Sequence, residues 1–329
     1  MAAANLVEIF SSFQGEGPHV GRSTLFVRFG GCDLRCRWCD SPHTWKPAAR
    51  CRFEDPARGE REIENPVSVA QIAAVAEALG AARHRFVSLT GGEPLLQPDA
   101  VLATAQALRG RGPRILLETH GVALAALEQV VDAIDVVSMD WKLASEVRRE
   151  GSARRAPREE FHAAHAAFLR TALRAPEVYV KVVVTPATRD DELDAMVRHL
   201  ADVDPGVPLV LQPVTPYGPV KATPVAAQLL AWQVRLERSL RDPSSQMIPI
   251  NRPVRAVTRD GKVINGRRLN EDTYTVQLTD EEGRLHSLVK SDLREYTIST
   301  KSTMPSYEKE LTRDELSDVV SYLLSLKGQ

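Results

Sequence analysis

The chain has 329 residues, and its 42 basic and 43 acidic residues give a formal net charge of −1. This length suggests about two domains, and the near-neutral charge argues against a protein that coats nucleic acid or an acidic membrane. Hydrophobic residues make up 43% of the chain, which argues against disorder. No apolar run approaches the roughly 18–20 residues of a membrane span, and the start lacks the layout of a signal peptide, so we expect a cytoplasmic protein.

The first 245 residues alternate between short apolar runs and capped helical stretches. Six runs are predicted to be strands: Leu25–Phe29, Phe86–Leu89, Ile115–Leu117, Val136–Met139, Val178–Val184 and Leu209–Leu211. Helices are predicted over 65–80, Asp99–Leu108, Leu124–Ile134, Glu159–Leu173, Asp190–Val203 and Thr223–Leu240. The alternation favours an α/β fold with a parallel sheet, open or partly closed as a barrel, and a site at the carboxyl ends of the strands.

The composition changes abruptly near residue 245. Residues 1–245 contain 37 alanines, whereas residues 246–329 contain one. We therefore predict two domains, 1–245 and 246–329. The second has the alternation of antiparallel strands over Arg255–Thr258, Lys262–Leu269, Thr273–Thr279 and Arg284–Lys290, followed by a helix from Thr312 to Leu326.

All four cysteines lie within the first 51 residues. Cys32, Cys36 and Cys39 have the spacing Cys-x3-Cys-x2-Cys directly after the first predicted strand. A structural zinc site needs four nitrogen or sulfur ligands, so Cys51 or a histidine would have to complete it. A 4Fe–4S cluster on three cysteines instead leaves one iron open for a small molecule. We favour the cluster and expect Cys51 to be a bystander thiol.

Two further polar segments follow predicted strands. Gly91-Gly92-Glu93-Pro94 comes after the second strand, and Glu118-Thr119-His120-Gly121 comes after the third. The glycines permit close backbone approach, and the Glu93 carboxylate can accept hydrogen bonds from an ammonium group. His120 is equally compatible with a site residue and with a structural histidine.

These motifs resemble a known family. The Cys-x3-Cys-x2-Cys spacing and the Gly-Gly-Glu-Pro segment are similar to the radical S-adenosylmethionine (SAM) superfamily. Residues 8–17, Glu-Ile-Phe-Ser-Ser-Phe-Gln-Gly-Glu-Gly, with Phe26-Val-Arg28 and Trp38-Cys-Asp-Ser41, resemble the 7-carboxy-7-deazaguanine synthases over about residues 6–245.

The resemblance implies a partial (β/α)6 TIM-like barrel and a carbon–nitrogen lyase of queuosine and deazapurine biosynthesis. Such an enzyme converts 6-carboxy-5,6,7,8-tetrahydropterin to 7-carboxy-7-deazaguanine and releases ammonia. It uses a 4Fe–4S cluster, SAM and Mg²⁺. The resemblance also implies an electron donor such as flavodoxin and a homodimer, with no nucleic acid or membrane partner.

The same resemblance assigns residue roles. The cluster would be held by Cys32, Cys36 and Cys39, and Ser41 would reach Mg²⁺. The substrate would contact Phe13, Gln14, Gly15, Arg28 and Thr90, of which Arg28 and Thr90 are the catalytic candidates. SAM would be bordered by Trp38, Cys39, Asp40, Gly92, Glu93, Ser138, Met139, Asp140 and Gln212. An arginine suits a substrate carboxylate because its guanidinium can donate paired hydrogen bonds.

Two parts of the chain depart from this pattern. The family's terminal strand reads roughly Arg-Val-Ile-Pro-Gln-x-His, but residues 246–252 read Gln-Met-Ile-Pro-Ile-Asn-Arg, which puts a contact that closes the pocket in doubt. Residues 301–307, with Met304, resemble the end of a c-type cytochrome module. The tail has no cysteine for covalent haem attachment, so we interpret it as a cytochrome-like fragment.

Two other functions remain open at this point. A radical SAM activase would make a glycyl radical on a partner protein and would need a protein-docking groove. An iron–sulfur electron carrier would use the cluster and the degenerate tail, but it would not need the Gly-Gly-Glu-Pro segment. Cleavage of SAM by the reduced protein separates the carrier from both enzymes.

Overall fold

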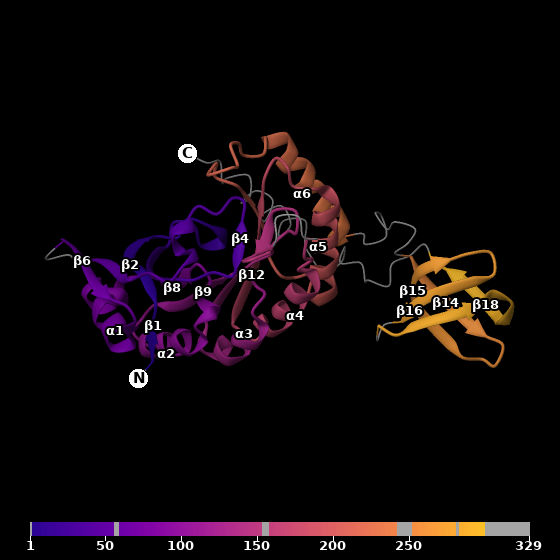
Figure 1. Cartoon of the computed structure of the whole chain (residues 1–329), viewed down its shortest axis with the longest axis horizontal. Helices are drawn as coiled ribbons and strands as arrows, with labels where there is room; N and C mark the ends of the chain where they lie inside the picture. The colour runs from indigo at the N-terminus through magenta and orange to yellow at the C-terminus, as the bar shows by residue number, and fades with distance from the viewer. Residues whose placement is uncertain (1, 56–58, 153–157, 242–251, 281–282, 300–329) are drawn as a thin grey trace. The chain divides into compact units, whose positions relative to one another are not determined.

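A computed structural model of the chain describes residues 2–55, 59–152, 158–241, 252–280 and 283–299 (Figure 1). The described residues fall into two compact units, 2–233 and 234–299. The domain boundary predicted near residue 245 lies outside the described residues. The first unit carries a nine-stranded sheet, and the second carries a five-stranded sheet.

Six parallel strands form the centre of the first unit, in the order β13-β12-β10-β9-β8-β3. They are β3 (Ser23–Phe29), β8 (Phe86–Gly91), β9 (Arg114–Thr119), β10 (Val136–Asp140), β12 (Glu177–Val184) and β13 (Leu209–Pro213). Their registers are parallel throughout, which confirms the six predicted strands and their topology. The residues of these strands are mostly apolar and buried, as is typical of a parallel sheet whose faces are covered.

The other strands of the first unit were not predicted. The sheet continues through β2 (Leu6–Phe13), antiparallel to β3, and through β5 (Arg50–Asp55) and β6 (Gly59–Glu64). Two short pairs lie apart: β1 (Ala3–Ala4) with β7 (Val67–Ser68), and β4 (Leu34–Cys36) with β11 (Val147–Arg149). The β5–β6 hairpin is rich in Arg and Glu, and the short strands span two or three residues, so neither has a periodic apolar signal.

Helices line the outer side of the curved sheet (Figure 1). They are α1 (Val69–Ala78), α2 (Pro98–Leu108), α3 (Leu124–Val130), α4 (His162–Ala172), α5 (Asp190–Val203) and α6 (Ala226–Arg241). The 3-10 turns are η1 (Gly17–His19), η2 (Pro42–Trp45), η3 (Ala81–Arg83), η4 (Pro94–Leu96), η5 (Val131–Ala133) and, in the second unit, η7 (Lys290–Asp292). All six predicted helices are present. The first starts four residues later than predicted, because Ser68 and Gln71 form a capping box that fixes its N-terminus.

The second unit is an antiparallel sheet in the order β17-β16-β15-β14-β18. Its strands are β14 (Pro253–Thr258), β15 (Val263–Glu271), β16 (Thr275–Asp280), β17 (Leu285–Val289) and β18 (Leu293–Ile298). The four predicted strands are confirmed, and β18 is an additional one that pairs with β14. The predicted helix over 312–326, Met304 and residues 246–251 of the altered terminal strand lie outside the described residues.

The second unit has its own small core, made of Val254, Ala256, Ile264, Val276 and Leu278. Replacing the fully buried Leu278 by alanine should lower the free energy of unfolding of this unit by about 3 kcal/mol, because the change leaves a cavity. Hydrogen exchange of peptides from residues 263–280 measures this loss. Leu285→Ala is the matched control, since Leu285 is 62% exposed. Equal effects of the two substitutions would contradict an independent core.

Candidate active site

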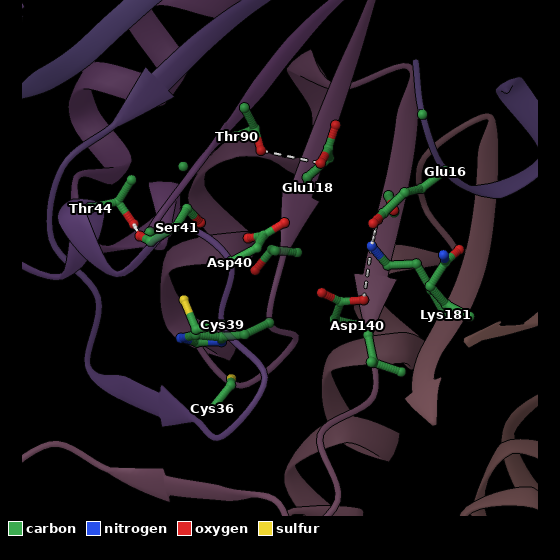
Figure 2. Close-up of a pocket in the computed structure, with 18 of the residues that line it drawn as sticks. Glu16, Cys36, Cys39, Asp40, Ser41, Thr44, Thr90, Glu118, Asp140 and Lys181 are labelled. Atoms are coloured by element: carbon green, nitrogen blue, oxygen red, sulfur yellow. Dashed lines mark hydrogen bonds and ion pairs between the residues drawn. The ribbon is translucent and has the colours of Figure 1, made fainter. Parts of the chain in front are cut away.

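A cavity of about 340 Å³ lies at the carboxyl ends of the parallel strands, and its size suits a small molecule. Each central strand contributes residues to it, including Arg28 from β3, Thr90 from β8, Glu118 from β9, Asp140 from β10 and Gln212 from β13. Figure 2 shows cysteines on one side of this cavity and a set of charged side chains on the other. The position agrees with the edge of the sheet that the topology predicts.

Backbone hydrogen bonds join the Gly-Gly-Glu-Pro segment to the start of the loop that carries Cys32, Cys36 and Cys39, which we call the cysteine loop. Gly92 N–H donates to the Phe29 carbonyl (3.0 Å), and Glu93 N–H donates to the Gly31 carbonyl (2.8 Å). A Cβ on Gly92 would lie 2.2 Å from the Gly31 oxygen. Gly91 has a φ of +134°, which favours glycine, and a Cβ there would lie 2.2 Å from the Phe29 oxygen. Gly91 and Gly92 are therefore required where these two backbone segments lie in contact.

Three of the four cysteines face the cavity. Cys32, Cys36 and Cys39 line it, whereas Cys51 is fully buried in β5 and does not. Cys32 and Cys36 pack against a small apolar cluster of Leu34, Val147 and Phe161. Burial raises the pKa of Cys32 to about 12 and that of Cys36 to about 11, so metal binding at these thiols must release protons.

The three thiols of the cysteine loop line one cavity and so share a common space. Within the described part of the chain, no three His, Cys, Asp or Glu side chains gather closely enough to hold one metal ion. A tetrahedral zinc site would require such a gathering. A 4Fe–4S cluster bonds each cysteine to a different iron, so its thiols lie apart around a common space. Three thiols that line one cavity meet that requirement.

Arg28 lies at the end of β3 with one side of its guanidinium already engaged. Its Nε donates to Glu8 Oε1 at 2.8 Å, and the guanidinium carbon lies 5.5 Å from the centroid of the Phe10 ring. Its terminal nitrogens make no hydrogen bond to any residue that the structure describes. The side chain lines the cavity, so these nitrogens are available to an anionic group of a ligand.

Glu118 is held by three donors at the end of β9. Its Oε1 accepts from Gln14 Nε2 (2.9 Å) and Ser88 Oγ (2.6 Å), and its Oε2 accepts from Thr90 Oγ1 (3.1 Å). An ionised carboxylate offers about four acceptor positions, so this one keeps an acceptor position for a ligand N–H group. Figure 2 shows the Thr90 contact. This arrangement makes Glu118 a preorganised carboxylate in the cavity.

A second group of charges lies beside β10 and β12. Lys181 Nζ forms an ion pair with Glu16 and lies 3.3 Å from Asp140 Oδ1, and Lys142 Nζ donates to Asp140 Oδ2 at 2.8 Å. Burial opposes ionisation of Asp140, but the two lysines outweigh it and lower the pKa of this carboxyl. The same carboxylates raise the pKa of Lys181 despite its burial. Asp140, Lys142 and Lys181 are therefore ionised at neutral pH.

Most of the residues predicted from the sequence meet at this cavity. Its lining includes Phe13, Gln14, Gly15, Arg28, Cys32, Cys36, Trp38, Cys39, Asp40, Ser41, Thr90, Gly92, Ser138, Asp140 and Gln212. The hydroxyl of Ser41 does not cap the η2 turn that follows it. His120 lines the cavity and also has a structural contact, since its Nε2 lies 2.8 Å from Asp33 Oδ1 in the cysteine loop.

Glu93 and Met139 are placed differently from the expectation. Both are fully buried and neither is among the lining residues. Glu93 Oε1 accepts from Leu95 N–H and Thr119 Oγ1, and Oε2 accepts from His120 N–H. The Glu93 carboxylate therefore braces the loops behind the cavity, because its oxygens are occupied by protein donors. Side chains alternate along a strand, so Met139 and its neighbour Ser138 lie on opposite faces of the sheet.

The charged residues of the cavity that were not assigned a role from the sequence include Glu16, Glu118 and Lys181. Each had a signal. Glu118 ends a buried strand, and Lys181 interrupts the otherwise apolar run Val178–Val184. Glu16 lies within the Gln-Gly-Glu-Gly segment next to Gln14. The ion pair of Lys181 with Glu16 and the hydrogen bonds that Glu118 accepts depend on tertiary contacts, which the local sequence does not contain.

Comparisons with known proteins agree with this site. Residues 26–200 match the model of the radical SAM superfamily. The chain is 38% identical over 233 residues to the 7-carboxy-7-deazaguanine synthase of Geobacter sulfurreducens, covering 67% of this chain and 87% of that protein. It is 33% identical over 222 residues to the synthase of Methanothermobacter thermautotrophicus, covering 65% and 83%.

Among solved structures, QueE from Escherichia coli is similar with a TM-score of 0.45 and 20% identity, covering 72% of this chain and 91% of that one. None of the helices in the described part of the chain has the length and apolar character needed to cross a membrane.

Proposed function

Because this chain belongs to the radical SAM superfamily and, within it, to the 7-carboxy-7-deazaguanine synthases, we propose that the cavity at the strand ends is where its substrate reacts. The chain is a radical SAM lyase of deazapurine biosynthesis, on the route to queuosine, and its cofactors are a 4Fe–4S cluster and SAM. Its reaction converts 6-carboxy-5,6,7,8-tetrahydropterin to 7-carboxy-7-deazaguanine with release of ammonia. The glycyl-radical activase and the electron carrier are set aside, since the matched relatives are synthases.

The thiols of Cys32, Cys36 and Cys39 would hold the iron–sulfur cluster. It would lie beside the apolar side chains of Leu34 and Val147. When bound, the cluster supplies the electron that cleaves SAM and so provides a radical able to abstract hydrogen from the substrate. Gly92, which lines the cavity beside the three thiols, would border the methionine part of SAM. Trp38, Ser138, Asp140 and Gln212 would border the rest of SAM.

Arg28, Thr90 and Glu118, which all line the cavity, would form its substrate half. The terminal nitrogens of Arg28 would bind the substrate carboxylate through charge-assisted hydrogen bonds. Glu118 would accept from an N–H of the pterin ring, since Gln14, Ser88 and Thr90 hold its carboxylate in place. Phe13, which is 68% exposed at the edge of the cavity, would cover the pterin once it is bound. The observation that carries the proposal is that this charged set and the three thiols share one cavity.

Several finer assignments also belong to the proposal. Ser41 would supply a hydroxyl to Mg²⁺, which usually has few protein ligands and several from water and substrate. An electron donor such as flavodoxin would reduce the cluster. We also propose a homodimer in the cytoplasm, where thiols stay reduced. Residues 1–245 would be the catalytic domain, and residues 246–329 would be a cytochrome-like fragment without covalent haem.

Turnover under anaerobic conditions tests the function. Reconstituted protein with the carboxypterin, SAM, Mg²⁺ and a reductant should yield 7-carboxy-7-deazaguanine, detected by liquid chromatography and mass spectrometry. Arg28→Ala should lower kcat/KM for the carboxypterin by about tenfold to a hundredfold, because a charged hydrogen bond contributes roughly 1.5–3 kcal/mol. SAM binding should be unchanged. Arg50→Ala, in the exposed part of β5, is the control. Equal turnover by wild type and Arg28→Ala would refute the carboxylate role.

A further inference from the structure

Lys181 is an unusual residue for its position in the fold. Strand β12 reads Glu-Val-Tyr-Val-Lys-Val-Val-Val, so Lys181 is the only charged residue after its first position. Side chains alternate along a strand, which puts Tyr179, Lys181 and Val183 on the same face, and both Lys181 and Val183 line the cavity. Lys181 is 6% exposed. A buried ammonium is costly unless it is paired, so its partners define its role.

The two partners of Lys181 come from separate elements. Glu16 comes from the loop after β2, and Asp140 is the register neighbour of Lys181 on the parallel strand β10. Figure 2 shows the Lys181 ammonium between the two carboxylates, with Glu16 on one side and Asp140 on the other. One ammonium therefore fixes two carboxylates that line the same cavity.

The two carboxylates are connected to different parts of the cavity lining. Glu16 is two residues from Gln14, which donates to Glu118 in the half assigned to the pterin. Asp140 uses its other oxygen to hold Lys142, whose Nζ lies 4.6 Å from the centroid of the Trp38 ring in the cysteine loop. Lys181 thus lies where the substrate half meets the half assigned to SAM.

We propose that Lys181 is a positioning residue that orients Glu16 toward the substrate and Asp140 toward SAM. The inference rests on the proposed function, from which the two halves take their names. Lys181 is not a proton donor in this role, because an ammonium between two carboxylates keeps its proton. Removal of the Lys181 ammonium would leave Glu16 without this ion pair. Asp140 would then be held by Lys142 alone.

The test compares Lys181→Met with wild type in cluster-loaded protein. Removing one partner of a buried charge group leaves the other unpaired and lowers stability, so circular dichroism and iron content first establish that Lys181→Met is folded and loaded, and Lys181→Arg, which keeps the charge, is measured beside it. The dissociation constants of SAM and of the carboxypterin should each rise about tenfold, measured by equilibrium dialysis with the cluster kept oxidised, so that SAM is not cleaved. Lys181→Arg should recover part of both affinities. Lys221→Met, at an exposed position away from the cavity, is the matched control.

A double-mutant cycle separates positioning from a general structural effect. Glu16→Gln should weaken carboxypterin binding in wild type but add little in the Lys181→Met background, because Glu16 is already released there. Unchanged dissociation constants in Lys181→Met, or additive effects of the two substitutions, would overturn the proposal. If wild type binds SAM but neither binds nor converts the carboxypterin, the proposed function fails, while the SAM measurement still tests the link between Lys181 and Asp140.

Discussion

Alanine in place of Cys32, Cys36 or Cys39 should abolish SAM cleavage, whereas alanine in place of Cys51 should leave it intact. The three thiols that line the cavity are the ones that can share a cluster, and loss of one removes a bond to iron. Cys51 is buried in β5 and does not line the cavity, so it is not placed to share a cluster with the other three. We expect a loss of at least about a thousandfold in SAM cleavage for each of the three variants.

Iron and sulfide counting, EPR of the reduced protein and detection of 5′-deoxyadenosine measure this outcome. The Cys51 variant serves as the control for handling and reconstitution. Wild type and the Cys51 variant should contain about four irons per chain. Loss of iron from the Cys51 variant equal to that from the others would show that the ligand set includes Cys51 and would revive the zinc-like four-cysteine arrangement.

Glu118→Gln should lower kcat/KM for the carboxypterin by roughly 150-fold, or about 3 kcal/mol, while the cluster and SAM binding persist. The substitution keeps the size of the side chain but removes the negative charge that, in the proposed function, would accept from the ring N–H of the substrate. Steady-state kinetics with saturating SAM measure the loss. SAM cleavage in the absence of substrate should match that of wild type, which separates a substrate contact from damage to the cofactor site.

Glu177→Gln is the matched control for Glu118. Glu177 is the first residue of β12 and therefore lies at the amino ends of the strands, away from the cavity at their carboxyl ends. There it pairs with Arg114 and His19. Its substitution should change kcat/KM by less than about threefold, since a partly exposed ion pair contributes little. Similar losses in the two variants would indicate that Glu118 acts through stability, and its assignment to the substrate would be wrong.

The sequence by itself determined the parallel core of the fold. Strands such as Val178–Val184 are apolar on both faces and are separated by capped helices, and this pattern favours parallel pairing with helical crossovers. The local motifs were also sufficient to predict which segments meet at the site. Cys32–Cys39 and Gly91–Glu93 follow strands, and parallel strands bring their carboxyl ends to one edge.

Only the tertiary structure decided how the charged residues of the site are paired. Lys181 and Asp140 are 41 positions apart in the sequence and become register neighbours because β10 and β12 are adjacent. The Glu118 carboxylate gains its three donors from β8 and from the loop after β2. A motif reports chemistry that is local in the chain, whereas the energy of a buried charge depends on partners that strand order brings into contact.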